Sequence, residues 1–409
     1  MIYKDRVMDI RKIKILIYGL GWFTKRYFES TKELQKYAPI EFLGFVDKRA
    51  KEFSNGYCGL QVYLPEELPT LEYDRIFIYV RDENGLFSII RNELIKDCMV
   101  EVSKIGNVAE LLMLVQEYYR LNMAKAQTRP PKIFDCFQFY NEIEITKIRM
   151  KILDPYVDYF VVVEMDKDHR GRSKPYNFER AITSFKKYSD KIIYVQPETL
   201  PEYDDSARDM YGHVWTLEHY QRSCIKLGLV DAEPEDIILI SDCDEIPDPK
   251  ILFQLRADQG NEYKSVSGTF LERGAIATRQ DYFYYFFNCH LKRRANTTTI
   301  VKYKNMMDPQ IIREFMDYLP YIDHGGWHLT YFGGLEKIKQ KISSIVEGKD
   351  VSDAEIMKRI CSAQDVFGRT GNEYDMEFLE KKDIPIPNID YWINKYPAFY
   401  FNRTQEEAK

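Results

Sequence analysis

Blocks of hydrophobic and polar positions alternate along the first third of the chain, and they predict strands and helices in turn. Residues 12–34 begin as a continuous apolar run, pass through a glycine pair and continue with helical spacing. Residues 39–47 and 73–80 are two further apolar runs of strand length. Because strands that alternate with helices are typical of a parallel, doubly wound sheet, we expect an α/β domain of the Rossmann-like kind here.

A second series of strands and helices follows a break in the pattern. Residues 107–127 have helical spacing and end at the helix breaker "TRPP". Downstream, we predict helices that begin near Asn141 and over 216–229, and strands over 132–139, 157–166, 191–198 and 235–247. The predicted domains are therefore a first α/β domain over 1–106, a connecting helix and linker over 107–131, and a second α/β domain over 132–409.

The composition excludes several classes of protein. Hydrophobic residues make up 45% and charged residues 30% of the 409 positions, which is typical of a soluble globular protein. A net charge of −6 leaves no basic footprint, so nucleic acid is not an expected partner. The seven cysteines form no CxxC pair, which favours reduced thiols. The N-terminal segment is charged and no apolar run approaches about 20 residues, so we expect a cytoplasmic protein without a membrane span.

The glycine pair almost matches a dinucleotide-binding turn. Gly19 and Gly21 occupy the first two glycine positions of G-x-G-x-x-G, but Thr24 stands at the third. Asp47 lies somewhat further on than the ~20 residues expected for a ribose-binding acid, and Trp22 is bulky for a pyrophosphate. The glycines are needed for a tight strand–helix turn in either case, so we favour a role in the fold, with nucleotide binding as the alternative.

Carboxylates gather where the strand over 235–247 ends. In "SDCDEIP", an extended chain places Asp242 and Asp244 on the same side. Two carboxylates there form a hard-oxygen site suited to Mg²⁺ or Mn²⁺, and a diphosphate can complete the shell of such an ion. An EF-hand is excluded because Ile246 and Pro247 stand where that loop needs a ligand and a glycine. A solvated acidic loop is the alternative interpretation.

Four sequence blocks, in order from residue 132 to about 370, resemble glycosyltransferase family 17, whose members include β-1,4-N-acetylglucosaminyltransferases. The blocks share the family's spacing of charged, glycine, proline and aromatic residues. They supply Asn141, Glu142 and Arg149; Glu164, Gly171, Lys174 and Pro175; Asp242, Asp244, Glu245, Ile246 and Pro247; and Gly326, Trp327 and His328. The resemblance does not cover residues 1–131.

This resemblance implies a GT-A fold with a mostly parallel central sheet and the nucleotide-sugar at the strand C-termini. It implies an inverting, metal-dependent transfer of a sugar, N-acetylglucosamine above others, from a UDP-sugar to a hydroxyl of a glycan acceptor. The eukaryotic relatives are anchored Golgi proteins, so a bacterial, cytoplasmic version is expected here. Its setting by analogy is the synthesis of surface polysaccharide or lipo-oligosaccharide, with peripheral membrane association left open, as is the oligomeric state.

The resemblance also suggests roles for individual side chains. Glu164 would accept hydrogen bonds from the nucleobase or ribose, and Glu142 belongs to the same donor-binding group. Asp242 would meet the ribose or the cation, and Asp244 the cation. His328 would be a further metal ligand, or a histidine packed beside Trp327. Lys174 and Arg222 are candidates for the diphosphate, although Arg222 also suits a helix surface.

An inverting transfer needs one carboxylate as general base. Because Asp244 is assigned to the metal, we expect the base to be Asp365, on a predicted helix near the acceptor, or alternatively Glu245. Two rival functions stay open. One is a sugar-nucleotide oxidoreductase or nucleotide sensor that acts through the first domain, and the other is a non-catalytic carbohydrate-binding module.

Overall fold

The computed structural model describes residues 11–80, 85–204, 206, 209, 212–257 and 267–402, so the first ten residues of the charged N-terminal segment lie outside the description. The chain divides into two compact units. The first contains Met1–Ala124, Lys304–Met307 and Asp317–Leu319, and the second contains the remaining residues. The helix predicted over 107–127 is found at Val108–Leu121 and groups with the first unit.

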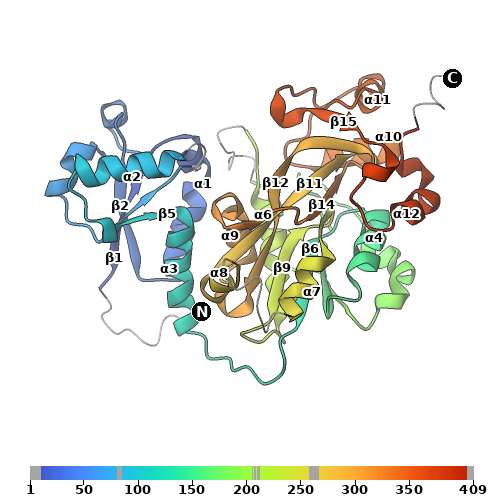
Figure 1. The fold of residues 1–409 in the computed structure, drawn as a ribbon, viewed down its shortest axis with the longest axis horizontal. Helices are drawn as coiled ribbons and strands as arrows, with labels where there is room; N and C mark the ends of the chain where they lie inside the picture. Colours follow the sequence, from blue (N-terminus) through green and yellow to red (C-terminus); the bar gives the residue numbers. More distant parts are fainter. Residues whose placement is uncertain are drawn as a thin grey trace. The chain divides into compact units, whose positions relative to one another are not determined.

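The first unit is built on a five-stranded parallel sheet in the order β3-β2-β1-β4-β5. Its strands are β1 (Ile13–Tyr18), β2 (Ile40–Val46), β3 (Gln61–Tyr63), β4 (Arg75–Ile78) and β5 (Ile105–Asn107). Its helices are α1 (Trp22–Glu33), α2 (Leu86–Lys96) and α3 (Val108–Leu121), all labelled in Figure 1. Both α2 and α3 contact β4. The predicted parallel α/β sheet is therefore confirmed. β3, β5 and α2 are elements that the pattern did not predict.

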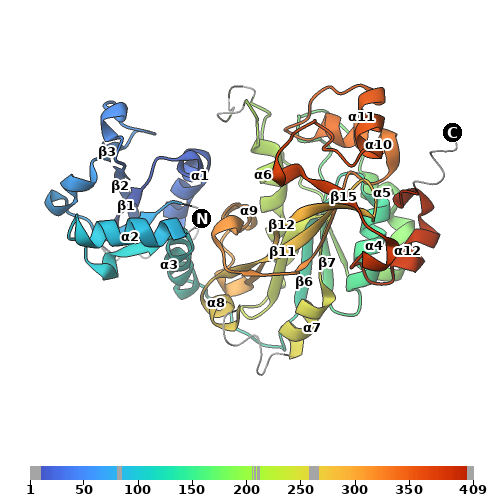
Figure 2. The ribbon, with the colours of Figure 1, turned by 45° about the horizontal axis from the view of Figure 1, so that its top comes forward.

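The second unit is built on a mixed ten-stranded sheet with the order β10-β14-β11-β12-β9-β6-β7-β8, and with β13 and β15 beside β11 and β12. The strands are β6 (Ile133–Gln138), β7 (Tyr159–Val163), β8 (Ile192–Val195), β9 (Ile237–Asp242), β10 (Glu245–Pro247), β11 (Ala275–Tyr284), β12 (Cys289–Lys302), β13 (Tyr321–Ile322), β14 (Gly326–Thr330) and β15 (Met376–Phe378). Figure 2 shows β6, β7, β11 and β12 as parts of one sheet.

The sheet of the second unit is parallel only in part. β9, β6, β7 and β8 pair in parallel, as the strand–helix alternation predicts. β12 instead runs antiparallel to both β11 and β9. The connection between β11 and β12 spans only residues 285–288, and a link this short joins antiparallel strands, whereas a parallel crossover needs a dozen residues or more. The expected mostly parallel sheet is thus a mixed one.

Helices cover the second sheet on both faces. They are α4 (Ile143–Leu153), α5 (Asn177–Arg180), α6 (Thr216–Ser223), α7 (Pro249–Ala257), α8 (Ser267–Arg273), α9 (Pro309–Glu314), α10 (Gly334–Ser344), α11 (Asp353–Cys361) and α12 (Ile389–Lys395). The helix predicted over 216–229 tightens after α6 into a 3₁₀ segment, Cys224–Leu229. α6 contacts α9, and α10 contacts α11.

A large hydrophobic core lies between the second sheet and these helices, and a further cluster of buried residues lies around β12, β14, α10 and α11. Buried residues of β6, β7 and β9, such as Phe137, Val162 and Leu239, pack with Ile148 of α4 and Trp392 of α12. None of the helices in the described parts of the chain is long and apolar enough to cross a membrane.

Candidate active site

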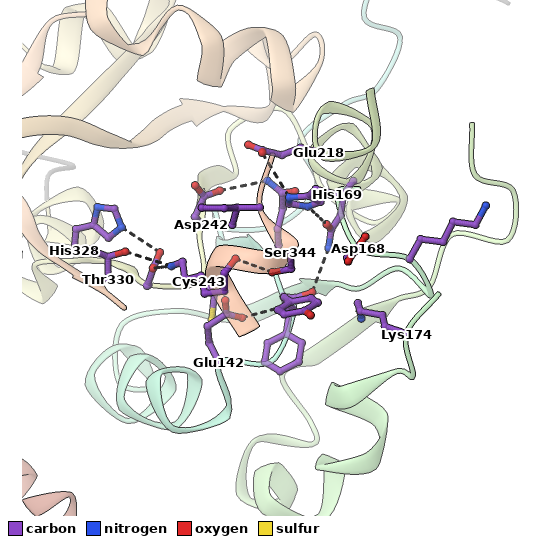
Figure 3. A pocket seen from close by; sticks show the side chains of 18 residues that line it. Glu142, Asp168, His169, Lys174, Glu218, Asp242, Cys243, His328, Thr330 and Ser344 are labelled. Atoms are coloured by element: carbon purple, nitrogen blue, oxygen red, sulfur yellow. Dashed lines mark hydrogen bonds and ion pairs between the residues drawn. The ribbon is translucent and has the colours of Figure 1, made fainter. Parts of the chain in front are cut away.

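A cavity of about 230 Å³ opens at the carboxyl ends of β6 and β9, the edge of an α/β sheet where ligands bind. Its walls come from the residues after β6, from the segment after β7, from the loop after β9, and from α6, β14 and α10. Figure 3 shows Asp242, Cys243 and His328 on one side of this cavity and Asp168, His169 and Lys174 on the other. Residues from all four sequence blocks therefore line the cavity.

Arg149 of α4 is fully buried and contacts the backbone of the loop after β9. Its guanidinium donates to the backbone carbonyls of Asp242, Cys243 and Glu245 at 3.0, 3.2 and 2.7 Å. The same group pairs with the buried carboxylate of Asp135 on β6. Three carbonyls drawn inward by one side chain fix the path of the loop, so Arg149 positions the acidic residues without lining the cavity wall.

Asp242 is the last residue of β9 and meets cations from two helices. Its Oδ1 accepts a hydrogen bond from Arg222 Nη2 at 3.0 Å, and its Oδ2 lies 3.5 Å from Arg313 Nη2. Burial alone would raise the pKa of this carboxyl, but the two guanidinium groups outweigh it and hold the pKa well below its usual range. Asp242 is therefore ionised, and its side chain keeps 38% of its exposure at the cavity wall.

Asp244, two residues on, is nearly buried and has its own pair of partners. Its Oδ2 accepts from Lys341 Nζ at 2.5 Å, and its Oδ1 lies 3.3 Å from His328 Nε2. Burial opposes ionisation here too, yet the charges of Lys341 and His328 keep the pKa of Asp244 far below normal. The cavity therefore has two permanent carboxylates, each already opposed by protein cations.

The chemistry of this side-chain set suits a divalent ion, although its arrangement is not that of a ready metal site. Two carboxylates and an imidazole are ligands that Mn²⁺ accepts, and His328 Nδ1 is buried without a hydrogen-bond partner among the described residues. The described parts of the chain nevertheless contain no group of three or more His, Cys, Asp or Glu side chains placed to hold a metal. Asp242 is drawn toward Arg222, and Asp244 toward Lys341.

The Glu164 carboxylate forms hydrogen bonds with other groups of the protein. It accepts from Lys174 Nζ at 2.7 Å, from the backbone N–H groups of Asn177 and Phe178 at 2.7 and 2.9 Å, and from the Tyr194 hydroxyl at 2.8 Å. Four donors around one fully buried carboxylate fasten the segment after β7 to the sheet. The described residues that line the cavity include Lys174 but not Glu164.

Glu142 lines the cavity, whereas Arg222 lies behind it. Glu142 Oε2 accepts the backbone N–H groups of Tyr140 and Asn141 at 3.1 and 2.9 Å, just before α4 begins. Arg222 connects Asp242 to Gln310 and Glu218, with Nη1 2.5 Å from Gln310 Oε1. Arg222 is 4% exposed, so it is a buried ion-pair partner and not a helix-surface residue.

The two predicted bases stand apart from the cavity, whose described lining residues include neither. Glu245 is buried and pairs with Arg313 Nη2 at 2.5 Å; burial raises its pKa, while Arg313 opposes that rise. Asp365 was expected on a helix, but α11 ends at Cys361 and Asp365 follows it in a turn. There it pairs with Arg369 Nη2 at 2.7 Å and accepts the Phe367 N–H at 2.9 Å.

Several cavity residues were not predicted from the sequence. Besides Lys341, they include His169 after β7 and Glu218 and Gln221 on α6. His169 Nε2 lies 2.8 Å from Gln221 Oε1, and its Nδ1 lies 3.5 Å from Glu218 Oε2. The spacing of Glu218, Gln221 and Arg222 on one helix was a usable signal, because positions three and four apart share a face. No such local signal existed for Lys341 or His169.

The glycine turn of the first unit is closed by Thr24 and by Asp47 from the loop after β2. Asp47 Oδ2 accepts the Leu20 N–H at 2.7 Å, and its Oδ1 accepts the Arg49 N–H at 2.8 Å and Arg49 Nε at 3.1 Å. Thr24 donates its hydroxyl proton to the Gly19 carbonyl at 2.6 Å. Burial would raise the pKa of Asp47, yet these donors lower it. Asp47, which the alternative interpretation would place at a ribose, is therefore hydrogen-bonded to the backbone of the turn, in keeping with the favoured role in the fold.

Comparison with known proteins adds two family matches. The model of glycosyltransferase family 17 matches residues 109–405, and a model described as C2185-like, N-terminal, matches residues 11–106. Beta-1,4-mannosyl-glycoprotein 4-beta-N-acetylglucosaminyltransferase from Rattus norvegicus is 26% identical over 124 residues, which cover 29% of this chain and 22% of that protein. The Homo sapiens protein of the same name gives the same figures. The chain thus spans about a fifth of the length of the curated relatives that it matches.

Proposed function

Because the chain belongs to glycosyltransferase family 17, we propose that it transfers N-acetylglucosamine from a UDP-sugar to a hydroxyl of a glycan acceptor. The family predicted from the four sequence blocks is confirmed, and the matched span, 109–405, is longer than the predicted one. The names of the two relatives support this donor sugar. Synthesis of a bacterial surface polysaccharide or lipo-oligosaccharide is the setting we propose.

The observation that carries the proposal is the cavity after β6 and β9. Asp242, Asp244 and His328 line it together with the ammonium-bearing residues Lys174 and Lys341. A nucleoside diphosphate is an anion that such cations bind, and the carboxyl ends of parallel strands are where nucleotides lie in α/β sheets. The cavity also lies within the part of the chain that matches the family.

We also propose fold assignments for both units. The strand order 3-2-1-4-5 of the first sheet, with every pair parallel, supports a Rossmann-like domain over 1–106 followed by the connecting segment 107–131. The parallel strands β9-β6-β7-β8, with the cavity at their carboxyl ends, support a GT-A-type domain over 132–409.

In the proposed reaction, the acceptor oxygen forms a bond to the anomeric carbon from the face opposite the diphosphate. The bond from that carbon to the diphosphate oxygen breaks, and its electron pair leaves with UDP. Lys174 and Lys341 meet the diphosphate, while Arg222 and Arg313 hold Asp242 in place beside it. A bound Mn²⁺ or Mg²⁺ would withdraw further negative charge from the leaving group.

The proton of the acceptor hydroxyl passes to a carboxylate within hydrogen-bond reach. Asp365 and Glu245 stay predictions for this base, and each pairs with an arginine. Glu142 and Glu218, which line the cavity, are added as candidates. To identify the base, each candidate carboxylate is replaced by its carboxamide. The variant of the true base loses turnover and the acidic limb of the rate–pH profile, and that variant keeps its affinity for UDP.

The test of the function is release of UDP from UDP-N-acetylglucosamine with a panel of glycan acceptors, with the new linkage identified by mass spectrometry and NMR. UDP-glucose and UDP-galactose serve as competing donors. A folded protein that binds glycan but transfers no sugar from any of these donors would contradict the proposal and favour a carbohydrate-binding module. Oxidation or reduction of a sugar nucleotide with a nicotinamide cofactor would favour the oxidoreductase.

A further inference from the structure

Lys341 occupies a place in the cavity where a metal ion would be expected. It lies in the last turn of α10, and its Nζ is 2.5 Å from Asp244 Oδ2 and 3.3 Å from Thr330 Oγ1. The ammonium group is also 5.3 Å from the centre of the Tyr331 ring. With His328 Nε2 beside Oδ1, both oxygens of Asp244 therefore face a nitrogen that can carry positive charge.

The Lys341–Asp244 ion pair differs from an ordinary structural ion pair because its two side chains line two adjacent cavities. Lys341, Asp244 and Glu142 line the main cavity and also a smaller one on the other side, next to Tyr331 and Phe332. The side chain of Lys341 keeps 23% of its exposure, whereas that of Asp244 keeps 6%. The lysine side chain is therefore more open to the cavity than the carboxylate that it pairs with.

A divalent ion at Asp244 Oδ2 and this ammonium group compete for the same oxygen. Mg²⁺ and similar ions bind carboxylate oxygens at about 2.0–2.2 Å, and Lys341 Nζ is already 2.5 Å from that atom. Two cations so close repel each other, and the more strongly the lower the local dielectric constant. An ion that binds Asp244 through Oδ2 therefore weakens the contact with Lys341 and favours its release.

We propose that Lys341 and a divalent cation exclude each other at Asp244, and that the released ammonium binds the diphosphate of the donor. This inference rests on the proposed function for its diphosphate part alone. A lysine on a flexible four-carbon stem suits this exchange, since its charge is a compact point that can turn from one oxygen to another. The cavity then keeps a cation at Asp244 in both states.

The first experiment measures Mn²⁺ binding to the full-length protein without nucleotide, by the EPR signal of free Mn²⁺. Lys341→Met removes the competing charge and is expected to tighten Mn²⁺ binding by at least about 10-fold, a usual size for coupling between two ligands. Lys339→Met is the matched control, because Lys339 is on the same helix and pairs with Asp353 and Glu336. Its Mn²⁺ affinity is expected to equal that of the wild type.

Asp244→Asn locates the ion and is expected to abolish the tight Mn²⁺ binding in both the wild-type and Lys341→Met backgrounds. Equal Mn²⁺ affinities of the wild type and Lys341→Met would overturn the exclusion. So would Mn²⁺ binding that survives Asp244→Asn, or the absence of Mn²⁺ binding by every variant. Should Lys341→Met fail to give a cooperative thermal transition, Lys341→Gln takes its place in the same titration.

The second experiment measures UDP and uridine affinity with saturating Mn²⁺ by calorimetry. If the released lysine meets the diphosphate, Lys341→Met weakens UDP by about 10-fold or more and leaves uridine unchanged. Unchanged UDP affinity, or equal losses for UDP and uridine, would overturn the second half of the proposal. A wild type that binds no UDP at all counts against the proposed function, whereas the Mn²⁺ titration without nucleotide still decides the exclusion at Asp244.

Discussion

The turn after β1 in the first unit and the loop after β9 in the second unit both depend on buried aspartates near strand ends. Asp47 takes its counter-charge from its own loop, Arg49 two residues on, and also accepts the N–H of Leu20, 27 residues earlier, in the turn after β1. Asp242 and Asp244 take their counter-charges from three separate helices, Arg222 on α6, Arg313 on α9 and Lys341 on α10. The carboxylate of Asp47 is hydrogen-bonded within the loop and turn, whereas Asp242 and Asp244 also line a cavity.

We use this difference as a criterion for separating structural acids from candidate functional ones in this molecule. A counter-charge from the same loop, such as Arg49, holds its carboxylate within that loop. Remote partners bring several helices to one point and leave space between them. The presence of an acid after a strand is therefore less informative than the origin of its counter-charge, and the predictions below test that distinction.

The largest effect is expected for Arg149, which supports the acidic loop from below. Arg149→Met leaves Asp135 buried without its partner and is expected to lower the free energy of unfolding by about 3–5 kcal/mol. Urea denaturation followed by tryptophan fluorescence measures it. The control is Arg256→Met, whose pair with Asp158 is part-exposed and is expected to change stability by about 1 kcal/mol or less. Similar losses in the two variants would contradict a special role for the buried arginine.

The next effect concerns Asp244. Asp244→Ala removes the carboxylate that Lys341 and His328 oppose, and turnover is expected to fall by about 100- to 1,000-fold with the fold retained. Steady-state UDP release and circular dichroism measure the two quantities. Asp47→Ala is the matched change in the other unit and is expected to leave turnover as it is. A folded Asp244→Ala protein that keeps most of its turnover would remove the functional half of the comparison.

Ligand binding gives a somewhat smaller effect. UDP-N-acetylglucosamine at 100 times its dissociation constant, with Mn²⁺, is expected to stabilise the protein by about 2.7 kcal/mol through mass action. The increase in melting temperature is expected to need the ion and to vanish in Asp244→Ala but not in Asp47→Ala. The same increase in EDTA would show that the protein cations alone hold the donor.

The smallest effect is expected for Asp47. Asp47→Ala leaves the Leu20 amide without its acceptor and is expected to cost about 1–2 kcal/mol in local opening of the turn, measured by hydrogen exchange of peptides over 18–28. Since the pKa of Asp47 is lowered below its ordinary 3.8, its contribution is present above that pH and is lost as the pH falls further. The difference between wild type and variant is therefore expected to disappear in acid. A difference that persists there would contradict the carboxylate's role.

Much of the framework follows from the sequence alone. Apolar runs of strand length predicted strands close to the observed positions of β1, β2, β4, β6, β7, β8 and β9. The antiparallel pair β11 and β12 was missed, since its polar residues, such as Arg279 and Asn296, hide the alternation. β3 and β5 have three residues each, too few to carry any pattern.

The cavity was predictable only where its chemistry is local. Asp242, Asp244 and His328 lie in short blocks with a recognisable spacing, and all three line the cavity. The assumption of an extended chain through both aspartates was wrong in detail, because β9 ends at Asp242 and a turn follows. Lys341 is 97 residues from Asp244, and Arg313 is 71 residues from Asp242. No periodicity reports a contact at that distance; only the tertiary fold creates it.

The support that Arg149 gives the acidic loop has a consequence for protein engineering. A designer who copied only the heptapeptide around the aspartates into another scaffold would leave behind the guanidinium that draws its carbonyls inward. The transplanted peptide would be free to point its acids in many directions. The smallest portable unit is therefore discontinuous, with Asp135, Arg149 and the loop moved together, and chimeras that respect this unit should keep the orientation of the acids.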